Sequence, residues 1–436
     1  MNPVQKKQKQ KPVRKTQQKT PEIAPNGTAI YLWAFVCSAA AFMLYFNTIG
    51  HDYVLDDYFA ITSNKLVQEG VHGIPSLLLT DFWNSAGKEL GYYRPLSLIT
   101  FALEYQFFGL SPHISHLINV ILYAFLVFML FLLVKRLFPA THNFIAFLTV
   151  LLFTAHPLHT EVVANIKGRD ELFSFLSVTG MLYFAIAYRE RKKRYLLIIA
   201  MIIFYLGLIS KESALTGIVL LPLALYYKQE NSLRKLIWSC SPFILVILIF
   251  FCQKAILFGL SGQELPDDIL FYPYRATEVK VPSAFMMFLF YFRMMIYPHP
   301  LRYDYAYNQI PAITWSSPIA LVGVIGFLGL VWFTIFQLRK RKLEGFALAF
   351  LLLSIFPAVG FLVLRGGIFA ERLLFAPTFG YCLFVVLLFY KLIRKKPEEA
   401  IFKSSGSAIP GIVAVLAFLC FFTMFSIATV NRNEVW

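Results

Sequence analysis

Long runs of apolar residues, separated by short polar stretches, dominate the chain from residue 29 onward. The runs AIYLWAFVCSAAAFMLYFNTI (29–49) and SAIPGIVAVLAFLCFFTMFSIATV (407–430) reach the roughly 20 residues that a helix needs to cross a bilayer. Their apolar positions are continuous rather than alternating, which favours membrane helices over the strands of a barrel. The pattern predicts eleven spans: 29–49, 114–134, 141–157, 170–188, 195–210, 212–228, 236–258, 314–338, 345–364, 371–391 and 408–430.

The composition supports the same class. Of the 436 residues, 58% are hydrophobic and only 15% are charged, whereas about a quarter of the residues in a soluble protein are charged. The five cysteines all lie in or beside apolar runs, without the spacing of metal ligands, so we expect no disulfide framework. The fold class predicted is therefore an all-α polytopic membrane protein.

The net charge of +16 raises the question of nucleic-acid binding, but its distribution argues against it. Basic residues concentrate in the tail 1–28 and in short loops such as RERKKR (189–194) and RKRK (339–342). The tail has no apolar period and no signal-peptide core, so we expect a disordered cytoplasmic arm followed by a retained span. Most of the 40 Lys and Arg then lie inside and most of the 24 Asp and Glu outside, which is the positive-inside pattern.

One further apolar stretch, AFMMFLFYFRMMIYP (284–298), would place RKRK on the wrong side if it crossed the membrane. We therefore expect it to be a re-entrant or interface-lying helix, which leaves an odd number of spans and an outer C-terminus. Residues 29–436 then form one transmembrane module with large outer loops at 50–113, 158–169 and 259–313.

The stretch HDYVLDDY (51–58) places two adjacent carboxylates, Asp56 and Asp57, just outside the first span. They are either solvated loop residues or reacting groups at the membrane surface. Neighbouring apolar and aromatic residues partly exclude water, which raises the basicity of a carboxylate and favours the second interpretation.

The outer face is where Lys and Arg are least expected, and those present lie next to acids or span ends. Either each pairs with a nearby carboxylate, or several converge on an anionic headgroup such as a phosphate. The candidates for phosphate binding are Arg94, Arg169, Lys211, Arg365 and Arg372.

A motif HPLHTE (156–161) ends the third predicted span. Its two histidines have the spacing of metal ligands on one helix face, but Pro157 disfavours a regular helix and no third ligand follows at the usual distance. We expect a hydrogen-bonded structural or substrate-contacting role instead. The residues expected to line a substrate cavity are His156, His159, Glu161, Glu212, Tyr303, Asp304 and Glu371.

Five motifs in a fixed order resemble one known family. VLDDY, HPLHTEVVANIKGRDEL, SKES, YFRMMIYPHPLRYDYAY and FAERLLFAPTFGYC together resemble the transmembrane and tetratricopeptide-containing O-mannosyltransferases and their bacterial relatives. The resemblance covers about residues 30–436. The family continues into tetratricopeptide repeats, whereas this sequence ends at NRNEVW, where we expect such an array to begin.

The resemblance implies a GT-C glycosyltransferase fold, with a large first outer loop of interfacial helices. It implies transfer of a sugar, mannose first, from a polyprenyl-phosphate donor to an acceptor hydroxyl, most simply on protein Ser or Thr. One of Asp56 and Asp57 is the expected general base of an inverting displacement. The basic residues given above stabilise the phosphate leaving group.

Several alternatives stay open at this stage. A GT-C transferase acting on a lipid or glycan acceptor, or a non-enzymatic lipid transporter or flippase, also fits intramembrane charges. No cofactor is required, although the adjacent Asp pair offers a place for a divalent metal. The tail composition and the missing repeats favour a bacterial inner membrane, with the N-terminus cytoplasmic and the C-terminus outside. The expected partners are the lipid-linked donor, an acceptor protein or glycan and membrane lipids, without nucleic acid.

Overall fold

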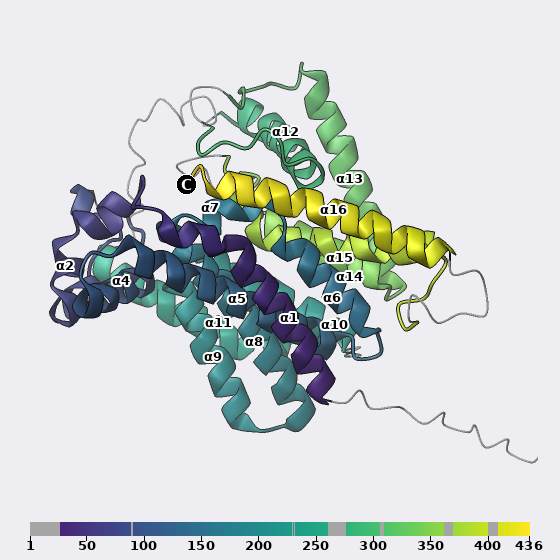
Figure 1. The fold of residues 1–436 in the computed structure, drawn as a ribbon, viewed down its shortest axis with the longest axis horizontal. Helices are drawn as coiled ribbons and strands as arrows, with labels where there is room; N and C mark the ends of the chain where they lie inside the picture. The colour runs from purple at the N-terminus through teal and green to yellow at the C-terminus, as the bar shows by residue number, and fades with distance from the viewer. Residues whose placement is uncertain are drawn as a thin grey trace, which may run out of the picture.

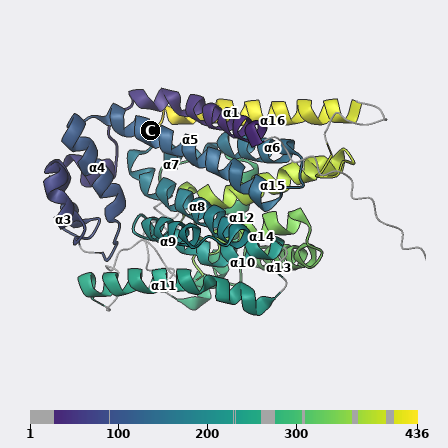
Figure 2. The same cartoon turned by 90° about the horizontal axis from the view of Figure 1, so that it is seen from below.

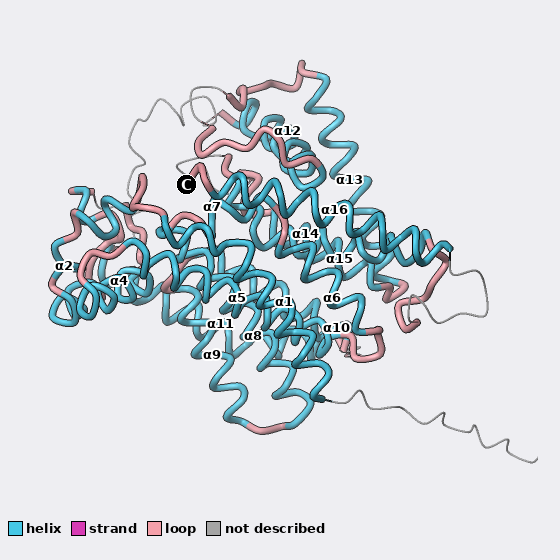
Figure 3. Tube along the Cα trace, in the orientation of Figure 1, coloured by secondary structure: helices cyan, strands magenta, loops and turns pink. Residues whose placement is uncertain are grey.

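A computed structural model of the chain describes residues 27–88, 90–228, 230, 232–259, 276–305, 309–361, 369–399 and 409–436. Within these ranges every regular element is a helix and no strand occurs (Figure 3). The predicted fold class, an all-α polytopic membrane protein, is confirmed.

The helices of ten residues or more pack as one bundle (Figure 1). They are α1 (Gly27–Tyr45), α4 (Pro95–Phe108), α5 (Pro112–Leu137), α6 (Asn143–Thr154), α8 (Arg169–Arg191), α9 (Arg194–Leu208), α10 (Gly217–Tyr227), α11 (Leu233–Phe258), α12 (Thr277–Ile296), α13 (Pro318–Arg339), α14 (Leu343–Ile355), α15 (Phe375–Leu392) and α16 (Ile409–Asn433).

Short helical turns make up the outer loops and the breaks between spans. They are α2 (Lys65–Gln68), α3 (Ile74–Leu77), α7 (Thr160–Val163), η1 (Phe46–Gly50), η2 (Tyr58–Thr62), η3 (Gly70–Gly73), η4 (Asn84–Ala86), η5 (Pro157–His159), η6 (Ile166–Gly168), η7 (Glu212–Thr216) and η9 (Glu371–Leu374). Most of these turns lie beside the candidate site described below.

Each of the eleven predicted spans corresponds to a helix, but not all of these helices are long enough to cross a bilayer alone. Eight helices in the described part of the chain have the length and composition of a span. Three predicted spans are shorter apolar helices, Arg194–Leu208, Glu212–Tyr227 and Leu343–Ile355. A fourth, predicted over 141–157, is the pair Asn143–Thr154 and Pro157–Val163, bent by 55°.

The breaks have local causes. Proline has no N–H and fixes its own φ, so Pro157 starts a new turn after α6, and Pro357 follows the end of α14. α9 ends just before Ser210 and Lys211, whose side chains are buried and bonded to α8. The chain therefore leaves the helical path where polar groups enter the interior.

Residues 284–298 lie mostly in α12, which is one continuous helix. The re-entrant form expected from sequence is therefore wrong, because α12 does not turn back on itself. α12 also passes the length and composition test for a span. The interface-lying alternative, which followed from charge, stays a prediction.

Close helix packing in the bundle relies on glycine. A Cβ at Gly380 of α15 would lie 2.6 Å from the carbonyl oxygen of Ala347 on α14. A Cβ at Gly323 of α13 would lie 2.6 Å from the carbonyl oxygen of Phe285 on α12. Small residues bring membrane helices into backbone contact, so these two pairs are held together by close packing.

Residues 50–113 form a helical subdomain at one end of the bundle, where Figure 2 shows α3 and α4 on the left. It has its own apolar cluster, which includes Ile61, Val67, Phe82 and Phe101 and which also takes in Ile166 of η6. Its outward side chains include Phe107 and Phe108 of α4, which are exposed. The subdomain agrees with the predicted outer loop of interfacial helices, and Ile166 fixes it to the turn that carries the site.

Basic residues gather at the ends of several helices. Basic residues occupy the last turns of α5, α8 and α13. In Figure 1, α1 begins and α8 meets α9 at the lower edge, whereas α2 and α4 lie at the left and the C-terminus lies above them. Cations at helix C-termini also complement the helix dipole. Which of the two ends faces the cytoplasm stays a prediction.

Candidate functional site

Asp57 is a buried carboxylate that ties two distant loops together. Its Oδ2 accepts the backbone N–H of Val54 at 3.0 Å, and its Oδ1 accepts the N–H of Lys167 at 2.8 Å. Burial raises the pKa of the Asp57 carboxyl to about 6, against the lowering effect of these two N–H groups. Because both oxygens are occupied by backbone donors inside the protein, Asp57 is placed to hold the loop rather than to meet a substrate.

Asp56 has the opposite environment. Its side chain is 45% exposed, and its Oδ2 lies 3.8 Å from the ammonium nitrogen of Lys167. The preceding Leu55 has a φ of +48°, which non-glycine residues rarely adopt. Such strain is found where the surrounding structure fixes a functional side chain. The turn leaves Asp56 as the accessible carboxylate of the pair.

Lys167 belongs to a buried ionic cluster, defined here as Arg94, Lys167, Asp170, Glu171, Lys211 and Glu212. Asp170, in the first turn of α8, is its centre. The Asp170 carboxylate lies 3.1 Å from Arg94 Nη1, 3.5 Å from Lys167 Nζ and 3.2 Å from Lys211 Nζ. Asp170 is thus the one carboxylate that all three cations of the cluster share.

Two more carboxylates complete the ionic cluster. Arg94 Nη2 lies 2.7 Å from Glu212, and Lys211 Nζ lies 2.7 Å from Glu171. The pairs join residues far apart in the sequence, so the cations are not satisfied only by their chain neighbours. Buried charges need such partners, because leaving one unpaired costs several kcal/mol.

Arg372 lies beside this cluster on η9. Its backbone N–H donates to Glu161 Oε2 at 2.7 Å, and its guanidinium donates to Glu161 Oε1. The Glu161 side chain is buried, whereas that of Arg372 is 34% exposed. Both Asp56 and Asp170 act electrostatically on Arg372, which places it at the mouth of the same site. Part of its guanidinium is therefore available to an anion from outside.

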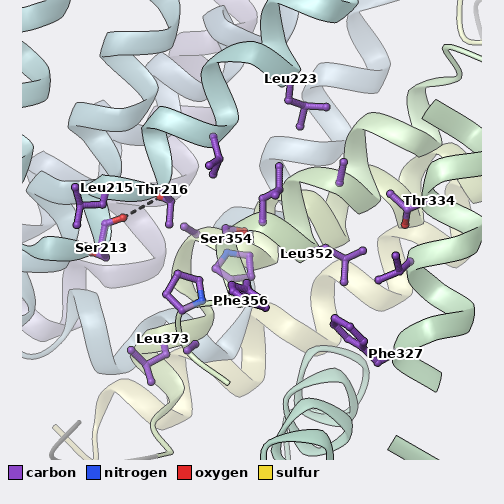
Figure 4. Close-up of a pocket in the computed structure, with 18 of the residues that line it drawn as sticks. Ser213, Leu215, Thr216, Leu223, Phe327, Thr334, Leu352, Ser354, Phe356 and Leu373 are labelled. Carbon is purple, nitrogen blue, oxygen red and sulfur yellow. Dashed lines mark hydrogen bonds between the residues drawn. The ribbon is translucent and has the colours of Figure 1, made fainter. Parts of the chain in front are cut away.

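A cavity of about 810 Å³ opens beside the ionic cluster (Figure 4). Glu171, Glu212 and Ser213 line its polar end. The rest is lined mainly by apolar side chains of α10, α13, α14, η9 and α15, among them Leu223, Phe327, Leu352 and Leu373. The cavity joins a polar end, whose two carboxylates are paired with Arg94 and Lys211, to a long apolar body, which is the shape of a site for an amphiphile.

Arg169, which the sequence analysis placed with the phosphate ligands, has another task. Its guanidinium is fully buried and donates to Glu104, to Asn119 Oδ1 at 2.7 Å, to Thr100 Oγ1 at 3.1 Å and to the carbonyl of Ser115 at 2.9 Å. These bonds join α4, α5 and α8. With its donors engaged by protein, Arg169 supports the fold under the site.

His156 and His159 are also core residues, and they do not line the cavity. Both side chains are fully buried. His156 Nε2 bonds the carbonyl of Met295 at 3.0 Å, and His159 Nδ1 bonds the hydroxyl of Tyr123 at 3.0 Å. The break at Pro157 turns them into the bundle. In the described residues no three His, Cys, Asp or Glu side chains are grouped closely enough to hold a metal.

Glu371, next to Arg372, connects three segments of the chain through its buried carboxylate. Its carboxylate is fully buried and accepts from Arg432 Nη2 at 2.7 Å, from the Tyr305 hydroxyl at 2.7 Å and from the N–H of Arg302 at 2.5 Å. It thereby joins α16 and the segment after α12 to η9.

The remaining predicted site residues do not join the cluster. Tyr303 and Asp304 are exposed and do not line the cavity. Arg365 lies outside the described residues.

Three residues of the ionic cluster were not chosen from the sequence as site residues: Lys167, Asp170 and Glu171. Arg432, the partner of Glu371, was not chosen either. Lys167 and Asp170 lie in NIKGRDELF, where a local ion pair was the simplest interpretation. Arg432 lies in the last turn of α16, and the cost of a charge at the end of an apolar span was the signal that could have identified it.

The known proteins that the chain resembles share one description. No family model matches the chain. It is 27% identical over 374 residues to Protein O-mannosyl-transferase F38B6.6 of Caenorhabditis elegans, covering 80% of this chain and 50% of the relative. It is 25% identical over 481 residues to Protein O-mannosyl-transferase TMTC1 of Homo sapiens, covering 95% and 50%. Over 143 residues, 32% of the chain, it is 37% identical to Protein O-mannosyl-transferase tmtc2 of Xenopus laevis.

These matches confirm the resemblance inferred from the motifs, and they extend over most of the chain. The chain spans about half the length of the curated relatives that it matches.

Proposed function

We propose that this relative of the protein O-mannosyl-transferases is itself a membrane glycosyltransferase. It transfers a sugar, mannose in our proposal, from a polyprenyl-phosphate donor to a hydroxyl of an acceptor protein. The observation that carries the proposal is a long apolar cavity whose charged end, Glu171 and Glu212, belongs to the ionic cluster, together with the accessible carboxylate of Asp56 beside Lys167 of that cluster.

The cavity supports a lipid-linked donor. Its walls are apolar along α10, α13 and α14, and only the end at Glu171 and Glu212 is charged. An isoprenoid chain gains free energy by leaving water for such walls, roughly 25 cal/mol per Å² of buried apolar surface. The chain would occupy the apolar body and bring its phosphate to the ionic cluster.

The cations next to the cavity's charged end support binding of that phosphate. Arg372, which precedes the lining residue Leu373, has a partly exposed guanidinium. Lys211 and Lys167 share the carboxylate of Asp170, with Glu171 as a second partner of Lys211 and Asp56 as a second partner of Lys167. Arginine and lysine stabilise the charge that develops on a departing phosphate, so no strong general acid is needed. Arg94 acts through Asp170 and Glu212, which it holds in place.

Asp56 is the proposed general base. As the acceptor oxygen bonds to the anomeric carbon, the carbon–oxygen bond to phosphate breaks and its electron pair leaves with the phosphate. The hydroxyl proton passes to the Asp56 carboxylate. A single displacement inverts the anomeric configuration. General-base help of this kind is worth about 10²–10⁴ in rate.

The proposed orientation of the protein in the membrane follows from the distribution of its charges. The site faces the outside of the membrane, the N-terminus lies in the cytoplasm and the C-terminus outside. We assign the protein to a bacterial inner membrane, with residues 29–436 as the catalytic module. The reaction as written needs no metal.

The test is transfer of radiolabelled mannose from polyprenyl-phosphate mannose to a Ser/Thr-rich peptide by the purified full chain, with and without a chelator. We expect labelled peptide with the inverted anomeric configuration in both samples. Absence of transfer together with absence of donor binding would contradict the proposal.

A further inference from the structure

A second hollow, distinct from the donor cavity, lies at the end of α12. It has a volume of about 310 Å³ and is formed by the last turns of α12, the segment that follows it and Phe369. None of its lining residues lines the donor cavity, and Glu371 of η9 packs beside it through Arg302 and Tyr305. The proposed transfer reaction does not use this hollow.

Two arginines face the hollow without a carboxylate partner. The guanidinium of Arg302 donates to the neutral amide oxygen of Gln309, and only its backbone N–H reaches Glu371. Within the described part of the chain, neither Arg293 nor Arg302 forms an ion pair. By contrast, Arg94, Arg169 and Arg372 each meet a carboxylate.

Glu371, a carboxylate beside the hollow, is paired with a different arginine. Glu371 gives one oxygen to Arg432, and its other oxygen accepts from the Tyr305 hydroxyl and the Arg302 N–H. The charge of Glu371 is thus matched by Arg432. The hollow keeps a positive charge from two guanidinium groups, and guanidinium is suited to binding phosphate through paired hydrogen bonds.

The other walls of the hollow combine apolar side chains with His299, Tyr305 and Gln309. Phe290, Met294 and Phe369 line it, and Phe369 is held by stacking on Tyr291, with ring centroids 4.2 Å apart. Just beyond, Ile296 and Tyr297 are exposed at the end of α12. Exposed aromatic and aliphatic side chains at the end of a membrane helix mark the headgroup level of the bilayer. A ligand here must therefore be anionic at one end and apolar at the other.

We propose that this hollow binds the phosphate group of a membrane lipid, with Arg293 and Arg302 as its ligands. The lipid's first chain segment packs on Phe290 and Met294. This is a second lipid site, independent of whether the donor cavity performs sugar transfer.

The test is native mass spectrometry of the full chain in detergent, titrated with dioleoyl phosphatidic acid and, separately, with dioleoylglycerol, which lacks the phosphate. The variant is the double substitution Arg293→Gln and Arg302→Gln. The matched control is Arg191→Gln and Lys193→Gln, which removes two exposed cations at the opposite end of the bundle.

We expect the tightest phosphatidic acid site to weaken about ten- to a hundred-fold in the Arg293/Arg302 variant, as for loss of charge-assisted hydrogen bonds. The control should match the unmodified protein, and dioleoylglycerol should bind weakly to all three. Equal phosphatidic acid binding by the variant, or equal binding of dioleoylglycerol, would overturn the proposal.

Two further arms distinguish the source of the anion. In competition experiments, inorganic phosphate or an acidic peptide is added at the same concentration as phosphatidic acid. Displacement of phosphatidic acid by either one would overturn the assignment to a lipid. Polyprenyl phosphate that competes better than phosphatidic acid supports a lipid phosphate and identifies the prenyl form. Should the double variant fail to fold, the single Arg293→Gln variant carries the same test, because Arg293 is exposed and supports no recorded ion pair.

Discussion

The carboxylate of Asp57 accepts the backbone N–H of Lys167 at 2.8 Å, a contact between residues 110 positions apart. The contact places the ammonium of Lys167 next to the carboxylate of Asp56, 3.8 Å away. One buried acid thus positions the accessible acid beside it. In this arrangement the two adjacent aspartates have different roles: Asp57 is a positioning residue and Asp56 the group that meets substrate.

Replacing Asp57 by Asn is expected to weaken the loop and slow the reaction. The amide has one acceptor oxygen, so one of the Val54 and Lys167 N–H groups loses its partner, at a cost of about 1–3 kcal/mol. A displaced Asp56 should lower turnover roughly ten- to a hundred-fold. Thermal unfolding and kcat measure the two effects. A variant that unfolds at the same temperature as the unmodified protein would show that these bonds do not hold the loop.

The titration of Asp57 predicts opposite pH effects on folding and on transfer. Its folded pKa, about 6, lies above the ordinary 3.8, so ionising it opposes folding. This contribution to stability is complete below pH 3.8 and is lost as the pH rises through about 6. It amounts to about 3 kcal/mol.

Transfer should rise through the same range, because only the ionised carboxylate accepts both N–H groups. The measurement is a pH profile of kcat/KM, alongside thermal unfolding, for the unmodified protein and Asp57→Asn. If kcat/KM of the Asp57→Asn variant still rises near pH 6 as it does in the unmodified protein, another group is responsible for the titration.

Filling the donor cavity should affect the lipid and not the chemistry. Leu352 points into the cavity (Figure 4), so Leu352→Trp is expected to raise the KM for a long-chain donor about tenfold and to leave kcat nearly unchanged. Leu245→Trp, on an exposed face of α11, is the matched control. An unchanged KM for the long-chain donor in Leu352→Trp would show that the lipid lies elsewhere.

The same substitution at two arginines should separate a structural role from a ligand role. Arg169→Gln leaves the buried Glu104 without its cation and is expected to destabilise the protein by about 3–5 kcal/mol. Arg372→Gln, at a partly exposed site, should leave the protein folded and weaken donor binding. Thermal unfolding and donor binding are measured on both. Stable Arg169→Gln protein that has lost donor binding would restore Arg169 to the phosphate site.

The bundle could be predicted because its signal is local. Continuous apolar runs specify helices, and basic residues at helix ends specify which ends lie together. The exact ends of the helices were harder to predict. Lys211, for example, is buried because it pairs with Asp170 and Glu171, and no local sequence pattern indicates that contact.

The site was predicted in part for the same reason. Sequence placed Asp56 and Asp57 outside the first span but could not distinguish them, because the difference depends on a partner in η6. It grouped Arg169 with the other outer cations, although Arg169 meets Glu104 and Asn119 only once three helices are packed. The burial of His156 and His159 likewise depends on where the chain turns after α6.

The central claim is that Asp56 is the base of a sugar transfer, and the most direct test compares two aspartates of the same loop. Asp56→Asn and Asp52→Asn are purified and assayed for mannose transfer and for donor binding. Asp52 is exposed, and its carboxylate accepts only a local N–H from Tyr53. We predict that Asp56→Asn binds donor normally but transfers about 10²-fold or more slowly, with Asp52→Asn unaffected. Full transfer activity in Asp56→Asn would contradict the account.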